Sequence, residues 1–208
     1  MSTYFEELIT KNKLGINDYA EFEKASRFYT FSRTEELKKN PVQGNYDYQH
    51  LKDIHKHIFQ DVFTWAGKDR YELEVFGFFG KGKSSFCVGE LIPHESKKLF
   101  DSLKEQNYFK DSKSLDHFSK EITAFLSDLN SLHPFREGNG RTQRIFIHEL
   151  AKNAGYKLDL GLIPKDKTVA AFVDCMNGRN GKMEALIKSN LKSFKQNQEL
   201  NSNRGLFL

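Results

Sequence analysis

The chain is poor in cysteine and has no long apolar run, and each of these shortages excludes a class of protein. Cys87 and Cys175 are its two thiols, and their spacing fits neither a disulfide framework nor a metal-ligand motif. No stretch approaches the roughly 18 consecutive apolar residues of a membrane-spanning helix, and no apolar secretion signal follows Met1. We therefore expect a protein of a reducing cytoplasm that has no membrane partner.

The formal net charge is also small, at +4 over 208 residues. Basic residues are spread along the chain, which is typical of a solvated surface, so we expect no direct contact with nucleic acid. Aromatic residues are plentiful, with 19 Phe and 8 Tyr, and they can fill a substantial core. The length favours one domain, which we place at residues 1–195, followed by a flexible polar tail at residues 196–208.

Apolar spacing predicts a mainly α-helical protein. Asp18 can cap one helix, and a second begins at Asp47 and has His55 on its inner face, which we interpret as a core histidine rather than a catalytic one. The strongest apolar stripe ends just before His133, and its members are Phe118, Ile122, Phe125, Leu129 and Leu132. Pro164 can open a later helix as its first residue, with an expected inward face of Val169, Phe172, Val173 and Met176.

One segment predicts a strand instead. Tyr71–Val75 alternates apolar and charged side chains, as a half-exposed strand does. Three glycines between residues 77 and 82 mark a turn, after which Phe86–Val88 can return as a second strand. We therefore expect a β-hairpin at about residues 71–88. One interpretation of this segment is a plain surface hairpin with buried phenylalanines.

The stretch from His133 to Arg144 gathers the groups that phosphate chemistry needs. It reads His-Pro-Phe-Arg-Glu-Gly-Asn-Gly-Arg-Thr-Gln-Arg, and the apolar residues after it continue as a helix. Imidazole titrates near neutral pH, so His133 can accept a proton from an attacking hydroxyl. A carboxylate suits a Mg²⁺ ion that also holds substrate phosphates, so Glu137 is the candidate metal ligand.

The turn inside this stretch suits an anion. Gly138 and Gly140 let the backbone approach a phosphate closely, and Asn139 tolerates the same left-handed geometry and can donate from its amide. The helix that follows presents unpaired N–H groups and the positive end of its dipole. Arg141 and Arg144 lie three residues apart and can fork onto phosphate oxygens or onto a carboxylate.

The same stretch matches H-P-F-x-[D/E]-G-N-G-R-x-x-R, the signature of the Fic family, and the chain also resembles that family from Gly44 to Arg70. The resemblance implies a helical domain with its core at about residues 45–160 and a small β-hairpin flap. It also implies a transferase that moves AMP from ATP to a Ser, Thr or Tyr hydroxyl of a target protein, with Mg²⁺ or Mn²⁺ as cofactor.

Residue roles are implied by position in the signature. His133 would be the general base and Glu137 the metal ligand. The anion hole and ATP-binding residues would be Gly138, Asn139, Gly140, Arg141 and Arg144. In Fic proteins the flap pairs with the main chain of the target, so the resemblance implies target docking at Val75, Phe76, Gly77, Lys81 and Lys83.

Many Fic proteins restrain themselves with a helix that carries [S/T]-x-x-x-E-[G/N], whose glutamate pairs with the second signature arginine. No Ser or Thr of this chain begins that motif. The resemblance therefore implies a bacterial toxin, active alone, that a separate small antitoxin restrains by placing such a glutamate on Arg144. Targets in that subgroup include the ATPase subunits of DNA gyrase and topoisomerase IV.

Two alternative functions remain open. One is a Fic enzyme with another donor, such as a kinase or a phosphocholine transferase, and the other is an inactive binding module. Kinase-type relatives replace a glycine of the anion hole, whereas Gly138 and Gly140 are both present here. The intact glycines favour AMP transfer, and the complete signature favours an enzyme over a binding module.

Overall fold

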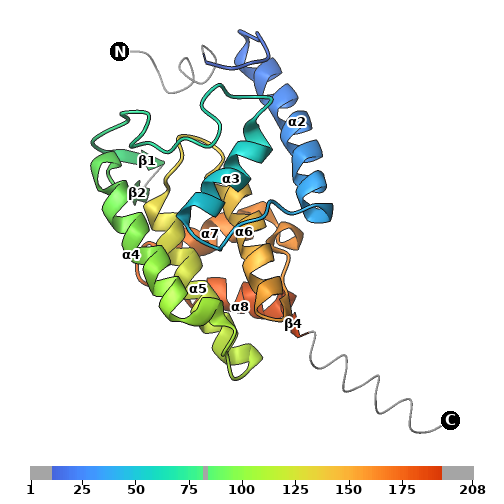
Figure 1. Cartoon of the computed structure of the whole chain (residues 1–208), viewed down its shortest axis with the longest axis vertical. Coiled ribbons are helices and arrows are strands. Elements are labelled where there is room, and N and C mark those ends of the chain that lie inside the picture. The colour runs from blue at the N-terminus through green and yellow to red at the C-terminus, as the bar shows by residue number, and fades with distance from the viewer. Residues whose placement is uncertain (1–10, 82–83, 194–208) are drawn as a thin grey trace, which may run out of the picture.

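The computed structural model describes residues 11–81 and 84–193, and in these the chain is mainly helical, as predicted (Figure 1). None of the described helices is both long and apolar enough to cross a membrane. Lys83 and the tail expected at residues 196–208 lie outside the described residues. The helices are α2 (Tyr19–Lys39), α3 (Tyr48–Phe59), α4 (Ile92–Glu105), α5 (Leu115–Leu132), α6 (Asn139–Asn153), α7 (Lys165–Cys175) and α8 (Gly181–Asn190).

The strands are short and form two antiparallel pairs. These are β1 (Phe79–Lys81) with β2 (Ser84–Phe86), and β3 (Tyr156–Lys157) with β4 (Lys192–Ser193). In the described residues, single-turn 3₁₀ helices lie at Gly89–Leu91, Asn107–Phe109 and Leu160–Leu162.

Helices α5 and α6 lie at the centre, with α2 and α3 packed on α6, and α4 and α8 packed on α5 (Figure 1). Ser114 caps α5 by accepting a hydrogen bond from the His117 N–H at 3.1 Å. The predicted stripe then faces the core, where Phe118, Ile122 and Leu129 are fully buried. The loop that joins α5 to α6 is therefore anchored at both ends in the most buried part of the molecule.

Helix α2 runs along one side of the molecule, beside α3 and α6 (Figure 1). Asp18 caps it as predicted, because its carboxylate accepts from the Glu21 N–H at 2.8 Å. The face toward the core buries Phe22, Ser26 and Thr30. This arrangement brings the middle of α2 close to the beginning of α6.

The hairpin is shorter and begins later than predicted. In the observed register Phe79 pairs with Phe86, and Lys81 pairs with Ser84. The hairpin lies beside α4 and α5 (Figure 1), and the Cys87 N–H donates to a carbonyl of α5 at 2.9 Å.

The strand expected at Tyr71–Val75 is wrong, because that segment forms turns. The Glu72 N–H donates to Asp69 Oδ1 and the Asp69 N–H donates to Glu72 Oε2, each at 2.9 Å. The Val75 N–H then returns to the Arg70 carbonyl at 2.8 Å. Such reciprocal side-chain bonds close a turn locally, and here they override the alternating pattern.

Helix α7 also differs from the expectation. Pro164 precedes the helix as its N-cap instead of being its first residue. Ala171 and Cys175 face the core, whereas Val169 and Val173 are 52% and 42% exposed. The small side chains let α7 approach α5 and α8, so the valines lie on the outer face.

His55 is a core residue, as predicted, and it ties α3 to the loop before α6. Its ring is fully buried and stacks on the Phe135 ring at a centroid distance of 3.9 Å. Nδ1 accepts from the Gly67 N–H at 2.9 Å, so Nε2 carries the hydrogen and donates to the Glu137 carbonyl at 3.0 Å. Burial lowers the pKa of His55 to about 3, so the folded protein keeps this ring neutral.

We predict that the free energy of unfolding falls as the pH drops from 6.5 toward 3. His55 gains a proton in the unfolded chain near its ordinary pKa of 6.5, but in the folded chain only near pH 3. Well below pH 6.5 this single group contributes a slope of about 1.4 kcal/mol per pH unit. Denaturant unfolding at several pH values should therefore give a flatter profile for His55→Gln than for the wild type, and parallel profiles would contradict the assignment.

Candidate active site

His133 ends α5 and begins the loop that contains the signature. Its backbone is left-handed, with φ 43° and ψ 58°, while its N–H still donates to the Leu129 carbonyl at 3.2 Å. This conformation is unfavourable for a residue with a Cβ, so the surrounding contacts must hold it. The chain leaves α5 abruptly here and reaches the start of α6 through residues 134–138 alone.

The side chain of His133 is oriented through its edge and through one face. Nδ1 lies 3.3 Å from the Asn130 carbonyl, which can only accept, so Nδ1 carries the hydrogen of the neutral ring. Nε2 then holds the lone pair that a general base uses. One face of the ring stacks on Phe86 of β2, with centroids 3.7 Å apart and planes inclined by 14°.

Arg70 joins this loop to the hairpin from inside the core, where it is fully buried. Its Nε donates to the His133 carbonyl at 3.0 Å, and its Nη2 donates to the Leu132 carbonyl at 3.2 Å. Nη2 also donates to the Cys87 carbonyl after β2, and the guanidinium lies 4.3 Å above the Phe79 ring. Burial lowers the pKa of Arg70, but a cation is favourable at the last carbonyls of α5, the negative end of that helix.

The side chain of Asn139 closes the loop between the two helices. Its Oδ1 accepts from the Phe135 N–H at 2.9 Å, and its Nδ2 donates to the Phe135 carbonyl at 2.6 Å. Asn139 is the first residue of α6, and Gly138 before it adopts the left-handed geometry that Asn139 could also tolerate. Because its amide is used inside the loop, the group it can offer to an anion is its backbone N–H.

The start of α6 has the properties of an anion site. Gly138 precedes it with φ 88°, and a methyl group there would lie 2.3 Å from the Phe59 ring, so glycine is required. Gly140 lies inside the first turn, where a methyl group would meet only Arg144 Nη1, at 3.7 Å. The N–H groups of Asn139 and Gly140 have no acceptor within α6 itself. They form part of the positive end of the helix dipole, which attracts an anion.

Arg141 and Glu137 lie side by side at this helix start. Arg141 Nη2 is 3.2 Å from Glu137 Oε1, and both side chains are about one-third exposed, at 27% and 32%. Arg141 Nη1 also donates to Thr30 Oγ1 of α2 at 2.8 Å, and the guanidinium lies 4.6 Å over the Phe59 ring. The pair is thus held in place from α2 and α3 but remains accessible to a ligand.

Arg144 is half-buried one helical turn further along. Burial lowers its pKa, and the neighbouring Arg141 lowers it further. In the part of the chain that the structure describes, no carboxylate forms an ion pair with Arg144. A partly desolvated cation beside a second cation favours an anionic ligand or partner.

Glu137 is the candidate ligand for a divalent metal ion at this site. The described residues contain no group of three or more His, Cys, Asp or Glu side chains that could hold a metal ion by themselves. Mg²⁺ commonly binds through one or two carboxylates while phosphate oxygens and water fill its other positions. The single carboxylate of Glu137 therefore fits a metal ion that arrives with a polyphosphate.

The residues expected to dock a target do not form one strand edge. Val75, Phe76 and Gly77 lie between the Asp69–Glu72 turn and β1, and Lys81 ends β1. Phe76 is 49% exposed, and the Gly77 N–H donates to the Glu90 carboxylate at 2.9 Å. Lys83 lies outside the described residues.

Three contacts at the site were not predicted, namely those of Thr30, Arg70 and Phe86. The bond between Thr30 and Arg141 spans 111 residues, and the bond between Arg70 and His133 spans 63. No local pattern signals contacts across such separations. For Phe86, the available signal is its place in the predicted hairpin.

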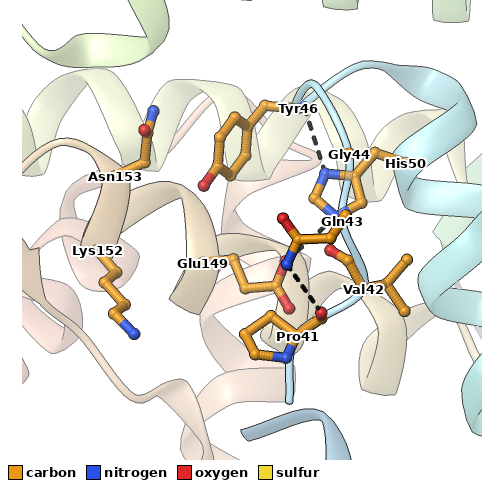
Figure 2. Close-up of a pocket in the computed structure, with 9 residues that line it drawn as sticks. All are labelled: Pro41, Val42, Gln43, Gly44, Tyr46, His50, Glu149, Lys152 and Asn153. Atoms are coloured by element: carbon orange, nitrogen blue, oxygen red, sulfur yellow. Dashed lines mark hydrogen bonds and ion pairs between the residues drawn. The ribbon is translucent and has the colours of Figure 1, made fainter. Parts of the chain in front are cut away.

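A separate hollow of about 320 Å³ lies at the other end of α6 (Figure 2). His50 anchors the loop that borders it: Nδ1 accepts from the Tyr46 N–H at 3.3 Å, and Nε2 lies 3.0 Å from the Val42 carbonyl. Nε2 also lies 3.3 Å from Glu149 Oε2 on α6. None of the lining residues belongs to the signature, so we interpret these contacts as packing of the loop and not as a catalytic site.

Comparison with known proteins agrees with this geometry. Residues 45–151, about half of the chain, match the Fic/DOC family. The protein adenylyltransferase VbhT of Bartonella schoenbuchensis is 34% identical over 94% of this chain, which spans 40% of that relative. The probable protein adenylyltransferase y4lH of Sinorhizobium fredii is 33% identical over 86% of this chain and 90% of its own length.

Solved structures show the same fold. The N-terminal Fic domain of a putative cell filamentation protein from Bartonella quintana, crystallised with bound ADP, has a TM-score of 0.80 and 29% identity, covering 89% of this chain and 92% of its own. BepC from Bartonella tribocorum, with bound AMPPNP, has a TM-score of 0.78 and 26% identity, covering 88% and 92%. Because the match includes the loop that carries His133 and the start of α6, this chain belongs to the Fic/DOC family.

Proposed function

We propose that this protein transfers AMP from ATP to a Ser, Thr or Tyr hydroxyl of a target protein. The observation that carries the proposal is one loop that brings an oriented imidazole next to a helix start suited to phosphate. The relatives VbhT and y4lH are named as protein adenylyltransferases, and the similar Fic domains were crystallised with adenine nucleotides. These names support the same donor here.

In the proposed reaction, the target hydroxyl oxygen attacks the α-phosphorus of ATP. His133 Nε2 accepts the hydroxyl proton as the new P–O bond forms. The bond from the α-phosphorus to the bridging oxygen breaks, and pyrophosphate leaves. The ring is suited to this role because Nδ1–H points to the Asn130 carbonyl, which selects the tautomer with the lone pair on Nε2.

The start of α6 would hold the triphosphate. The N–H groups of Asn139 and Gly140 supply donors there without reorganisation, since the Asn139 side chain already closes the loop. Arg144 and Arg141 would pair with phosphate oxygens; burial and the neighbouring Arg141 lower the pKa of Arg144, and an anion bound beside it would favour its charged form. Glu137 would hold Mg²⁺ or Mn²⁺, which neutralises the polyphosphate when bound.

Target docking is proposed at the hairpin and the segment before it. An edge of β1 or β2 can pair with an extended main chain, which gives affinity with little dependence on side chains. Val75, Phe76 and Gly77 border this edge, and Lys81 contributes its strand backbone. Lys83 belongs to the same proposal but lies outside the described residues.

We further propose that a separate small antitoxin restrains the enzyme. Such a protein would place the glutamate of an [S/T]-x-x-x-E-[G/N] helix against Arg144 and so block the triphosphate. The absence of this motif from the chain and the absence of an ion pair to Arg144 among the described residues both support the proposal. The ATPase subunits of DNA gyrase and topoisomerase IV are the proposed targets in the bacterial cell.

The phosphate of ATP that stays on the target protein shows which group the enzyme transfers. We expect label from α-labelled ATP, but none from γ-labelled ATP, on a protein of a bacterial lysate or on the purified gyrase and topoisomerase IV ATPase subunits. AMP transfer keeps the α-phosphate on the target and releases the others as pyrophosphate. Retention of the γ-label would instead indicate a kinase, and no label from either donor would favour an inactive binding module.

Removal of the proposed base should abolish transfer and spare the fold. We expect His133→Ala to lower the rate of AMP incorporation about 10²- to 10⁴-fold, the usual contribution of general base catalysis. His57→Ala is the matched control, because His57 lies on α3 and contacts Glu36 at the surface. Equal rates for the wild type and His133→Ala, with unchanged circular dichroism, would exclude His133 as the base.

The antitoxin proposal predicts a specific binding defect. Expression of the wild-type chain alone should be toxic, and a pull-down from the source bacterium should recover a small protein with the glutamate motif. Arg144→Ala should weaken that complex about 10- to 100-fold, because a hydrogen-bonded charge pair contributes about 1.5–3 kcal/mol. Arg179→Ala is the control, since Arg179 pairs with Asp174 at the surface; harmless expression together with no such partner would contradict the proposal.

A further inference from the structure

The flap hairpin covers one face of the proposed catalytic ring. Phe86 is the last residue of β2, and its ring lies parallel to the His133 imidazole at 3.7 Å. Phe79, its partner across the hairpin, is further away, with centroids 6.2 Å from His133. The two strands therefore bring one aromatic ring into face-to-face contact with the imidazole.

The hairpin is held firmly enough for this contact to act as a restraint. The Cys87 N–H, next to Phe86, donates to the Ser131 carbonyl near the end of α5 at 2.9 Å. Arg70 bonds to carbonyls on both sides of the contact, those of Cys87 and His133, while its guanidinium lies over the Phe79 ring. Phe86 and His133 are thus connected through backbone contacts as well as through their rings.

A stacked ring restrains the imidazole in a way that its Nδ1 bond does not. The torsion between Cβ and an aromatic ring has a broad energy minimum, so ring planes turn easily unless a neighbour blocks them. The bond from Nδ1 to the Asn130 carbonyl is long, at 3.3 Å, and selects the tautomer more than it fixes the plane. A flat ring at 3.7 Å blocks rotation of the plane toward it.

We propose that Phe86 is a positioning residue, which fixes the plane of the His133 ring so that Nε2 points at the target hydroxyl. This inference rests on the proposed AMP transfer and adds a second role to the flap. The hairpin that receives the target would also aim the base.

Three variants separate positioning from general stability. Phe86→Leu removes the flat face but keeps an apolar side chain, and Phe86→Tyr keeps the aromatic ring. Phe31→Leu is the matched control, because Phe31 lies on α2 outside the flap, is 68% exposed and is not stacked on His133. Circular dichroism and thermal melting of each variant show whether the fold is retained.

The first measurement is the NMR signal of the His133 ring in histidine-labelled protein, assigned by its loss in His133→Ala. A phenyl ring shields protons above its face, so we expect an upfield signal in the wild type, in Phe86→Tyr and in Phe31→Leu. In Phe86→Leu the signal should return toward the position of an unstacked histidine. This readout needs neither ATP nor a target.

The second measurement is the initial rate of AMP incorporation into lysate protein. For Phe86→Leu we expect a rate lower by about tenfold at saturating ATP with an unchanged KM for ATP, since misalignment of a reacting group commonly costs one to two orders of magnitude. Phe86→Tyr should restore the rate. A wild-type rate in Phe86→Leu, or no shielding of His133 in the wild type, would overturn the positioning role. A wild type that shows shielding but incorporates no AMP would refute the proposed function itself.

Discussion

The site depends on a short loop that joins the end of one buried helix to the start of the next. Two hydrogen bonds between the Asn139 side chain and the Phe135 backbone close this loop, and Phe135 is itself buried against His55. With the loop closed, the imidazole of His133 and the first turn of α6 lie a few residues apart on rigid elements. Catalytic groups carried by rigid elements lose little rotational freedom when a substrate binds.

The closed loop also brings together two helix ends of opposite polarity, the end of α5 and the start of α6. The negative end of α5 receives the buried guanidinium of Arg70, which donates to the carbonyls of Leu132 and His133. The positive end of α6 has no acidic residue in its first turn and gathers Arg141 and Arg144 instead. Arg70 donates to the carbonyls at the end of α5, whereas the start of α6 has two arginines beside the single carboxylate of Glu137, and a polyphosphate would bind there.

Burial and local partners give the histidines near the centre different roles. His55 is fully buried with both ring nitrogens bonded to backbone groups, and burial lowers its pKa to about 3, which suits a structural link. His50 holds the loop of residues 42–46 against α6 in the same way (Figure 2). His133 differs because a left-handed backbone turns it out of the helix, and its stacking partner belongs to the hairpin instead of the core.

The amino-acid sequence by itself determined the helical class, the core stripe of α5 and the structural role of His55, and it placed the signature from His133 to Arg144 between two helices. These follow from short-range rules, namely helical periodicity, capping by Asp18, and the left-handed turn that Gly138 permits. The strand predicted at Tyr71–Val75 from its alternating pattern was wrong, because the bonds between Asp69 and Glu72 close a turn there. Tertiary structure alone decided that Thr30, Arg70 and Phe86 contact the signature, and that Val169 and Val173 face outward. Such contacts join segments far apart in the chain, and they are set by how whole helices and the hairpin pack rather than by any neighbouring residue.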